Sequence, residues 1–369
     1  MEKHLNVHAA DSASVAHIRD SLGIPELVAR VLVGRGISDV EQARLFLQPD
    51  IERDWNDPLL IPGMEQAVPV LADAIESHER IMVFGDFDVD GISSTAVLVK
   101  GFTALGAADV ATLIPRREDE GYGLTDAALE RVFADKPDVL VTVDCGITAA
   151  CEVDRLIEAG ISVVVTDHHE PGEGVPHDVP VVDPKLDAGC PSFDLAGAGV
   201  ALKLVCALGA RLGMPDLWRS LADLAMLGTI SDRMKLEGEN RALVVCGLKL
   251  LNDSPRPGIA AALALIPHAT LPVTAVALSF GLIPRLNAAG RMLDAQIALD
   301  LLLVDDPVRG GLLAAKLEQV NDERRATEAE LAEEALAQAQ RVVNAHEEAG
   351  TPLRCLVLAD EGWHEGVKG

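Results

Sequence analysis

The sequence has few aromatic side chains and far less basic than acidic charge. Among its 369 residues, aromatics make up 3%, and 58 acidic side chains outnumber 31 Lys and Arg, for a net charge of −27. The acidic excess excludes a cationic surface that binds nucleic acid along the whole chain, although metals and a few placed arginines can still hold a polyanion locally. The shortage of aromatics limits the number of base-stacking platforms.

The sequence also lacks CxxC pairs and long hydrophobic runs, and its polar start leads us to expect no secretory leader. Its six cysteines are scattered, and its first residues, MEKHLNVHAADS, are polar and charged. Reduced thiols and a cytoplasmic location are therefore expected. Because the apolar stretches are interrupted well before ~20 residues, we expect no transmembrane helix. Hydrophobic residues still make up 49% of the chain, which permits a sizeable core and excludes a disordered chain.

The pattern between residues 65 and 182 predicts an α/β fold with a parallel sheet. Short β-branched runs alternate there with segments of helical periodicity, as in sheets that are covered by helices on both faces. The expected strands are 81–84, 110–114, 139–143, 161–166 and 179–182. The expected helices lie near 65–78, 92–105, 125–134 and 148–159.

Helical segments are expected on both sides of the sheet region. Residues 312–349 contain no Gly or Pro and predict one long helix, and a strand is expected at 354–359. Because the few residues after that strand cannot form a domain, we expect the chain to be truncated inside a second domain. The expected parts are an N-terminal helical arm (1–60), an α/β catalytic domain (61–250), a helical extension with turns at 252–258 and 283–284 (251–308), a connecting helix (309–350) and the start of the second domain (351–369).

Three carboxylates, Asp86, Asp88 and Asp90, alternate in the loop GDFDVDG (85–91) after the first expected strand. Carboxylates gathered in a loop that ends in Gly form a site for a hard cation. The loop also fits the start of an EF-hand, but Val97 stands where that motif needs Glu, and a strand rather than a helix precedes it. A phosphatase-type nucleophile at Asp86 or Asp88, or a solvated acidic turn, stays open for this motif alone.

Two further expected strands end in residues that can bind a ligand. Asp144 follows the third strand, and Asp167, His168, His169 and Glu170 follow the fourth. Asp144 alone is a weak signal, because Asp often caps a following helix. Ligands of parallel α/β sheets bind at the carboxyl ends of the strands, so these loops are expected to converge. Carboxylates and imidazoles suit Mn²⁺ or Mg²⁺, and one shared carboxylate, such as Asp144, would make a two-metal site for in-line attack on phosphorus.

The segments GDFDVDG, VDCG (143–146), TDHHE (166–170) and LGTISD (227–232) resemble, in this order, the motifs of the DHH phosphoesterase family. PRLNAAGR (284–291) narrows the resemblance to the RecJ branch, the single-strand-specific exonucleases, and EGYGL (120–124) and GWHEGV (362–367) are similar as well. The resemblance extends over roughly residues 40 to 369. It implies a DHH domain joined by a long helix to a second core domain, and degradation of single-stranded DNA from the 5′ end in recombination and repair.

The resemblance further implies two ions, Mn²⁺ or Mg²⁺, in one site. Phe84 stands where some family members have a metal-binding His. The residues expected to hold the first ion are Asp88 and Asp144, with Asp86 beside them. The residues expected to hold the second are Asp90, Asp144, His168 and Asp232.

The remaining implied roles concern the substrate. His169 would face the scissile phosphate, and Asp167 would orient the imidazoles through hydrogen bonds. The residues expected at the substrate are Arg285, Asn287 and Arg291, which would bind its phosphates, and Tyr122, which would touch it or pack beneath its loop. Single-stranded DNA is the expected partner, with a single-strand-binding protein and a helicase as further candidates, and the full-length protein is expected to be a monomer.

Two alternative functions fit the sequence less well. The first is another DHH activity, such as hydrolysis of oligonucleotides, cyclic dinucleotides or pyrophosphate, and PRLNAAGR and the long helix argue against it. The second is a catalytically inactive scaffold similar to Cdc-forty-five of eukaryotes. Such a scaffold would be expected to lose metal ligands, whereas the acidic and His set is complete here.

Overall fold

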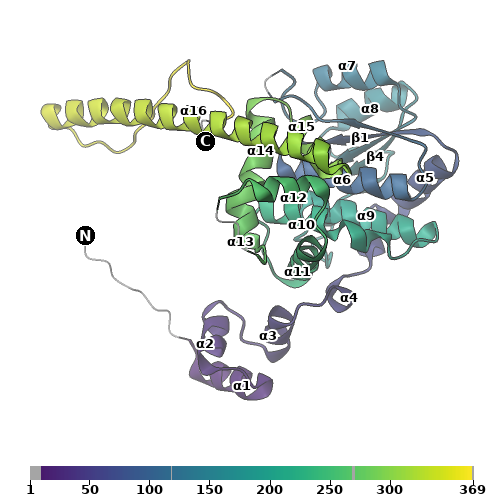
Figure 1. Cartoon of the computed structure of the whole chain (residues 1–369), viewed down its shortest axis with the longest axis horizontal. Helices are drawn as coiled ribbons and strands as arrows, with labels where there is room; N and C mark the ends of the chain where they lie inside the picture. Colours follow the sequence, from purple (N-terminus) through teal and green to yellow (C-terminus); the bar gives the residue numbers. More distant parts are fainter. Residues whose placement is uncertain (1–9, 118, 268–270, 368–369) are drawn as a thin grey trace.

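The centre of the molecule is a parallel five-stranded sheet in the order β2-β1-β3-β4-β5, with helices on both faces (Figure 1). The structure is a computed structural model, and it describes residues 10–117, 119–267 and 271–367. The strands are β1 (Arg80–Gly85), β2 (Asp109–Leu113), β3 (Val139–Val143), β4 (Ser162–Thr166) and β5 (Val181–Val182). The predicted α/β class is therefore confirmed, and the ends of all five expected strands lie within two residues of the observed ones.

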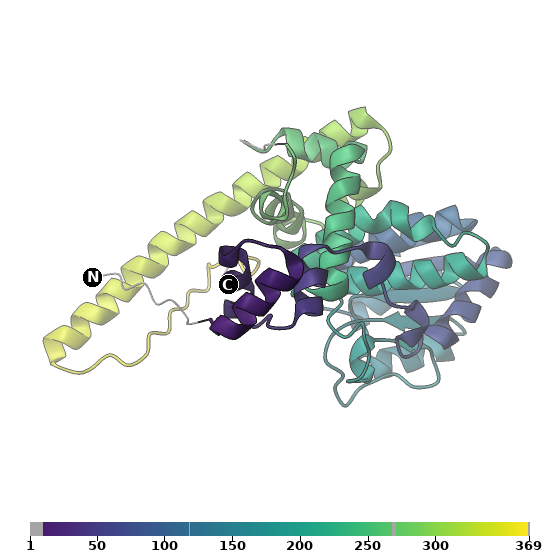
Figure 2. The same ribbon diagram turned by 90° about the horizontal axis from the view of Figure 1, so that it is seen from below.

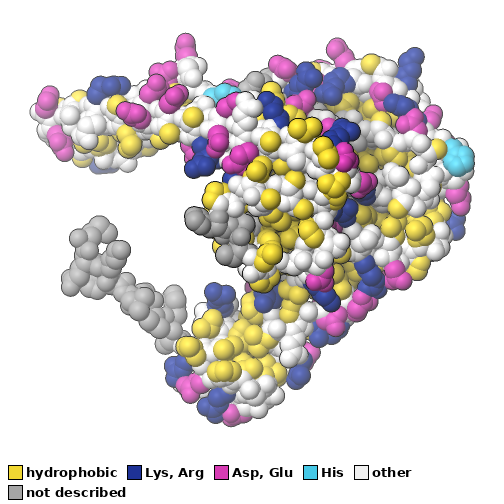
Figure 3. All heavy atoms as spheres, in the orientation of Figure 1, with side chains coloured by type: hydrophobic (Ala, Val, Ile, Leu, Met, Phe, Trp, Pro, Cys, Tyr) yellow, Lys and Arg dark blue, Asp and Glu magenta, His cyan; other side chains and the backbone are white. Residues whose placement is uncertain are grey.

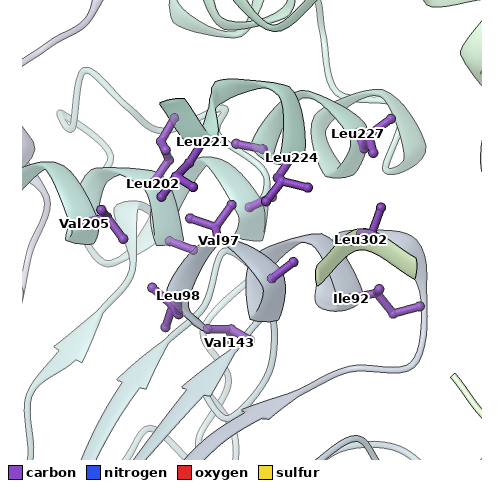
Figure 4. Packing of buried hydrophobic residues seen from close by; sticks show 14 of the residues in the cluster. Ile92, Val97, Leu98, Val143, Leu202, Val205, Leu221, Leu224, Leu227 and Leu302 are labelled. Atoms are coloured by element: carbon purple, nitrogen blue, oxygen red, sulfur yellow. The ribbon is translucent and has the colours of Figure 1, made fainter. Parts of the chain in front are cut away.

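The sheet is buried because helices cover both of its faces. Helices α5 (Met64–Glu76), α6 (Val89–Ala104) and α9 (Gly197–Arg211) share one hydrophobic core with inward-facing residues of β1 and β3. Helices α7 (Asp126–Asp135) and α8 (Ala150–Glu158) form a second core on the opposite face. Figure 4 shows the first core, where Val97 and Leu98 of α6 pack against Leu202 and Val205 of α9. Apolar side chains on both faces explain the nearly continuous β-branched runs of the strands.

Further helices pack on the α6 side of the sheet. Those from the expected catalytic domain are α10 (Ala222–Ser231) and α11 (Gly238–Asp253). Those of the expected helical extension are α12 (Pro257–Ala264), α13 (Ala275–Ala277), the π-helical turn η4 (Leu278–Leu282), α14 (Ile283–Met292) and α15 (Gln296–Leu303). The turn expected at 252–258 is present between α11 and α12. The prediction of a turn at 283–284 is wrong, because these residues begin helix α14. Proline is compatible with that position because the π-helical turn η4 directly before α14 interrupts the regular α-helical hydrogen-bond pattern there.

The N-terminal arm is helical and has a small core of its own. Its helices are α1 (Ser12–Leu22), α2 (Glu26–Gly34), α3 (Val40–Leu47) and α4 (Ile51–Asp54), and the 3-10 turn η1 (Pro58–Leu60) follows them. Two further 3-10 turns, η2 (Pro184–Leu186) and η3 (Leu217–Leu221), belong to the main body. The arm is joined to the main body where Trp55 stacks on Trp218 with 5.4 Å between ring centroids. Beside this stack, the buried Lys203 pairs with Glu239 and donates to the carbonyl of Asn56.

The long helix α16 (Pro307–Ala349) packs on α12 and α14 with its first half and projects from the body with its second half (Figures 1 and 2). It begins before residue 312 and includes Gly310, where a side chain would meet the backbone of Gly258. The strand expected at 354–359 does not form, since no other strand lies beside it within the described residues. Instead, residues 351–367 return alongside α16 toward α14 (Figure 2).

Residues 1–9 and 368–369, at the two ends of the chain, lie outside the described part. The expected arm includes residues 1–9, which also carry most of the segment considered as a leader, and the expected second-domain segment includes residues 368–369. Among the described helices, none is both long and apolar enough to cross a membrane.

Candidate metal centre

Loops from four parts of the chain meet at the carboxyl edge of the sheet. The DFD loop follows β1, Asp144 follows β3, the DHH segment follows β4, and Asp232 ends α10. Strands β1 and β3 are neighbours whose crossovers leave in opposite directions in the order β2-β1-β3, so a crevice opens between their ends. Doubly wound sheets bind their ligands at this switch point. The convergence predicted for these loops is thus present in the structure.

The polar atoms at this edge form three overlapping groups of potential metal ligands. Within each group the ligand atoms lie within 4.8 Å of one another. The groups are Asp86, Asp88 and Asp144; Asp90, His168 and Asp232; and Asp144, His168 and His169. The first group contains the residues expected around the first ion, and the second contains those expected around the second ion except Asp144. Asp144 belongs to two of the three groups.

The ring of His168 is aimed at the centre of these carboxylates. Its Nε2 lies 3.0 Å from Oδ1 of Asp144, 3.6 Å from Asp90 and 3.8 Å from Asp232. Burial lowers the pKa of His168 to about 4, and the nearby His169 contributes to the fall. The imidazole is therefore neutral near pH 7, and a neutral imidazole nitrogen is a metal ligand.

The carboxylates are buried and repel one another. Burial, followed by the charge of Asp88, raises the pKa of Asp86 to about 7 and that of Asp90 to about 8. Burial and then Asp90 raise the pKa of Asp144 well above its usual range. Oδ1 of Asp86 and Oδ1 of Asp144 are buried without a hydrogen bond. A divalent cation would supply the missing partner and neutralise the charge, so this oxygen-rich donor set fits Mn²⁺ or Mg²⁺.

The carboxylates of Asp90 and Asp144 lie close to the backbone at the start of α9. Asp90 accepts the N–H groups of Gly197 and Ala198 at 2.8 and 2.9 Å. A side chain at Gly197 would stand 2.7 Å from Oδ1 of Asp144, so only glycine fits. Asp144 itself has a left-handed φ of 60°. A conformation that is unfavourable for a non-glycine residue persists where the surrounding structure requires it, and such residues cluster at functional sites.

His169 is positioned differently from His168. Its Nδ1 lies 2.7 Å from Oδ1 of the buried Asp167, and its ring is half exposed toward the site. This hydrogen bond raises the pKa of His169. Burial opposes ionisation of Asp167, but hydrogen bonds from His169 and from the Ile147 and His168 amides keep its pKa below the usual value. Asp167 therefore orients the ring of His169 as expected, whereas its bond to His168 reaches only the backbone.

The PRLNAAGR segment packs against the DFD loop (85–91), which carries Asp86, Asp88 and Asp90, and does not lie open to solvent. Oδ1 of Asn287 accepts the N–H of Val89 at 3.1 Å. A side chain at Gly290 would stand 2.2 Å from the carbonyl oxygen of Phe87, so α14 and the DFD loop are in direct contact. The predicted turn around these residues is replaced by helix α14, which brings Asn287 and Gly290 to the same face one turn apart.

Arg285 is not brought to the metal centre. Its guanidinium is buried and pairs through two nitrogens with Glu318 of α16, and its third nitrogen donates to the carbonyl of Gly281. Arg291 lies at the other end of α14 and is exposed, with one nitrogen 3.2 Å from the carbonyl of Gly366. Tyr122 is half exposed and packs edge-on against Phe87 with 6.2 Å between ring centroids.

One carboxylate at this edge was missed by the sequence analysis. Asp183 follows β5 just as Asp144 follows β3, and it is fully buried with Oδ2 lacking a hydrogen bond. Burial raises its pKa to about 7, and Asp167 contributes to the rise. The signal was present in the sequence, because Asp183 directly follows the fifth expected strand.

Comparison with known proteins places this site in a class. The model of the DHH family, N-terminal domain, matches residues 80–229, which include every proposed ligand except Asp232. The single-stranded-DNA-specific exonuclease RecJ of Bacillus subtilis is 37% identical over 365 residues, which cover 98% of this chain and 44% of that protein. The chain thus spans less than half the length of that relative.

Solved structures agree with the sequence matches. The crystal structure of RecJ from Thermus thermophilus in complex with Mn²⁺ superposes with a TM-score of 0.80 at 34% identity, over 97% of this chain and 49% of that one. A crystal structure of exonuclease RecJ bound to manganese superposes with a TM-score of 0.74 at 39% identity, over 83% of this chain and 75% of that one. The chain belongs to the RecJ family of DHH-domain proteins.

Proposed function

We propose that the chain forms the catalytic core of a metal-dependent phosphodiesterase that degrades single-stranded DNA from its 5′ end. The observation that carries this proposal is the convergence of carboxylates and a neutral imidazole at the β1/β3 switch point, with buried oxygens that lack hydrogen bonds. The two RecJ structures bound to manganese support the choice of metal, and the relatives' description as single-stranded-DNA-specific exonucleases supports the choice of substrate.

The proposed ligands divide between two Mn²⁺ or Mg²⁺ positions. Asp86, Asp88 and Asp144 would hold the first ion, and Asp90, Asp144, His168 and Asp232 the second. When bound, paired ions lower the pKa of water for attack on phosphorus and stabilise the charge of the leaving oxygen. The overlap of the groups at Asp144 supports a carboxylate shared by both ions.

The side chains of this chain would position the substrate and handle its protons. His169, with its pKa raised by Asp167, would present a charged N–H to a phosphate oxygen next to the ions. Arg291 and Tyr122 would contact the strand from the open side, since both side chains are exposed. Arg285 is engaged by Glu318, so we now assign it to anchoring α14 on α16 and Asn287 to holding the metal loop.

The metal sites are tested by thermal unfolding with and without Mn²⁺. Ligand binding to the folded state raises the melting temperature, and excess Mn²⁺ at about 100 times Kd should add roughly 2.7 kcal/mol. Asp144→Ala should remove most of this rise, because its carboxylate would touch both ions. Asp253→Ala, which removes an exposed carboxylate at the end of α11, is the control and should keep the full rise. An undiminished rise in Asp144→Ala would refute the shared ligand.

The activity is tested by digesting end-labelled single-stranded and duplex DNA with the unaltered chain and Mn²⁺. Release of mononucleotides from the 5′ end of the single strand, and its absence in Asp144→Ala, is the expected result. Cleavage of cyclic dinucleotides but not of long strands would favour another DHH activity. Metal binding without any hydrolysis would favour the inactive scaffold, which the complete ligand set argues against.

The setting of this activity is part of the same proposal. We place the protein in DNA recombination and repair, in the cytoplasm, with a single-strand-binding protein and a helicase as partners and a monomeric full-length form. The free state of all six cysteines supports a reducing compartment. Co-purification from bacterial cells with and without DNase treatment would separate direct protein partners from partners that share a DNA strand.

A further inference from the structure

A cavity of about 540 Å³ opens next to the metal centre, at the junction of α10, the π-helical turn, α14 and α16. Its lining includes Ser231, Arg233, Phe280, Asn287, Arg291 and Arg324. Two of them flank the proposed ligand Asp232, and Asn287 bonds to the loop that carries the carboxylates. The cavity therefore adjoins the metal centre on the side of Asp232.

An exposed aromatic ring stands at this cavity. Phe280 is 82% exposed, although the chain has only seven Phe and most of its large apolar side chains are buried. It lies in the π-helical turn that interrupts the helix from Ala275 to Met292. Such a turn holds an extra residue, changes the direction of its side chains and recurs at functional sites. Leaving this ring in water has no benefit for the fold, so a partner that stacks on it would explain its position.

Three arginines line the cavity together with this ring. Arg233 has a left-handed φ of 56°, and within the described residues neither its side chain nor that of Arg291 has a carboxylate within 4.0 Å. Arg324 reaches the cavity from α16, where it contacts Glu328 and Asn321. Partial burial of the guanidinium lowers the pKa of Arg291, although part of the side chain is exposed, and the charges of Arg117 and Arg324 lower it further. Cations that repel one another in a chain of net charge −27 are stabilised by an anion.

We propose that this cavity is a nucleotide subsite, in which a base of the single strand stacks on Phe280 while Arg233, Arg291 and Arg324 bind the phosphates on either side of it. The inference rests on the proposed function and adds the part of the strand that lies beyond the scissile phosphate. An aromatic face beside an arginine-lined groove is the common means of holding single-stranded nucleic acid without sequence preference. Because Arg324 belongs to α16, the long helix forms one wall of the DNA path.

The test measures equilibrium binding of labelled oligothymidylate, dT12, to the full chain by fluorescence anisotropy, with Ca²⁺ in place of Mn²⁺ to limit cleavage. Phe280→Ala should weaken binding about 10-fold, the loss of one base stack. The same variant should change binding of an abasic 12-mer less than about 2-fold, and Phe280→Trp should restore binding of dT12. Arg233→Gln should weaken the binding of both strands. It should also reduce the slope of log K against log salt by roughly 0.7, which corresponds to the loss of one phosphate contact.

Two matched controls lie on α16, one for the arginines and one for the exposed apolar ring. Arg325→Gln and Leu312→Ala change exposed residues of α16 outside the cavity and should bind dT12 normally. Equal losses of Phe280→Ala on dT12 and on the abasic strand, or none on either, would overturn the stacking site, as would failure of the unaltered chain to bind dT12. Cleavage of dT12 in Mn²⁺ is scored separately. Absence of cleavage with the expected binding pattern would therefore count against the proposed function and leave the subsite supported.

Discussion

Burial keeps individual carboxyl groups of the metal centre protonated near pH 7, and a bound metal ion would remove these protons. Asp86 and Asp90 have pKa values raised to about 7 and about 8 by burial and by neighbouring carboxylates. Without a metal, both groups therefore retain protons that the unfolded chain has already released near its ordinary carboxyl pKa. Cation binding must displace these protons, so metal affinity and stability are linked to pH through the same side chains.

We predict that the metal-free protein loses stability as pH rises from 6.5 to 8.5. A raised native pKa contributes stability that is complete at low pH and is lost as pH passes through the native value, which here lies near 7 for Asp86 and 8 for Asp90. The raised pKa of His169 acts in the same direction, and His168, with a pKa of about 4, is already neutral in this window. Melting in EDTA should show a fall on the order of 5 °C.

Two comparisons make this pH prediction specific to the site. Asp86→Asn should flatten the slope above pH 6.5, since one titrating group is removed. Saturating Mn²⁺ should raise the melting temperature most at pH 8.5, where fewer protons have to be displaced than at pH 6.5. A metal-free melting temperature that increases through this window would contradict the assignment of raised carboxyl pKa values.

At the level of elements, α14 sets the position of the metal loop. Gly290 allows this helix to touch the carbonyl of Phe87, so Gly290→Ala forces the DFD loop to move. We expect the variant to fold and its Mn²⁺ affinity to fall on the order of 10-fold or more, as for other residues that orient metal ligands. Isothermal titration measures this loss. Gly311→Ala on α16 is the control, since its Cβ would meet no atom within 4 Å.

The ion pair between α14 and α16 is a second prediction at this scale. Arg285 and Glu318 are largely buried, so removing one partner leaves an uncompensated charge that costs about 3 kcal/mol, less where Glu318 reaches water. Chemical denaturation should show this loss in Arg285→Ala. Arg285→Met combined with Glu318→Leu should recover much of it. Lost DNA affinity at unchanged stability in Arg285→Ala would instead support direct contact with phosphate, as the sequence suggested.

The molecule as a whole is a compact body with two unequal projections. The N-terminal helices lie on one side of a hollow and α16 lies on the other, while the metal centre and the arginine-lined cavity are parts of the central body (Figures 1 and 3). The second half of α16 and residues 351–362 are mostly exposed. The last described residues return to α14, where Gly366 contacts Arg291 and Trp363 donates to Glu334 of α16.

Limited proteolysis should follow this division. Residues 352–359 have an exposed backbone in neither helix nor strand, so cleavage by a protease of broad specificity should begin there and then enter the distal part of α16. The body from about 65 to 300 should resist, because the sheet and its two cores lie within it. Mass spectrometry of the early fragments locates the first cuts. First cuts within α6 or α9 would contradict this order of stability.

The sequence by itself determined the sheet and which polar side chains meet at its carboxyl edge. Strand runs and the polar residues that follow them are local patterns, and parallel strands bring their carboxyl ends to one edge whatever the loops do. The DFD loop, Asp144 and the DHH segment could therefore be predicted to meet. Asp183 follows the same rule, because it comes directly after the fifth expected strand, although it was not among the expected ligands.

The tertiary structure alone decided what the arginines and the exposed Phe280 do. Arg285 and Arg291 look alike in PRLNAAGR, yet Arg285 is neutralised by Glu318, 33 residues away, whereas Arg291 stays beside the cavity with Arg233 and Arg324. The expected strand at 354–359 likewise failed for lack of a neighbour. Ion pairing, exposure and strand pairing depend on which distant segments pack together, and no local pattern records that choice.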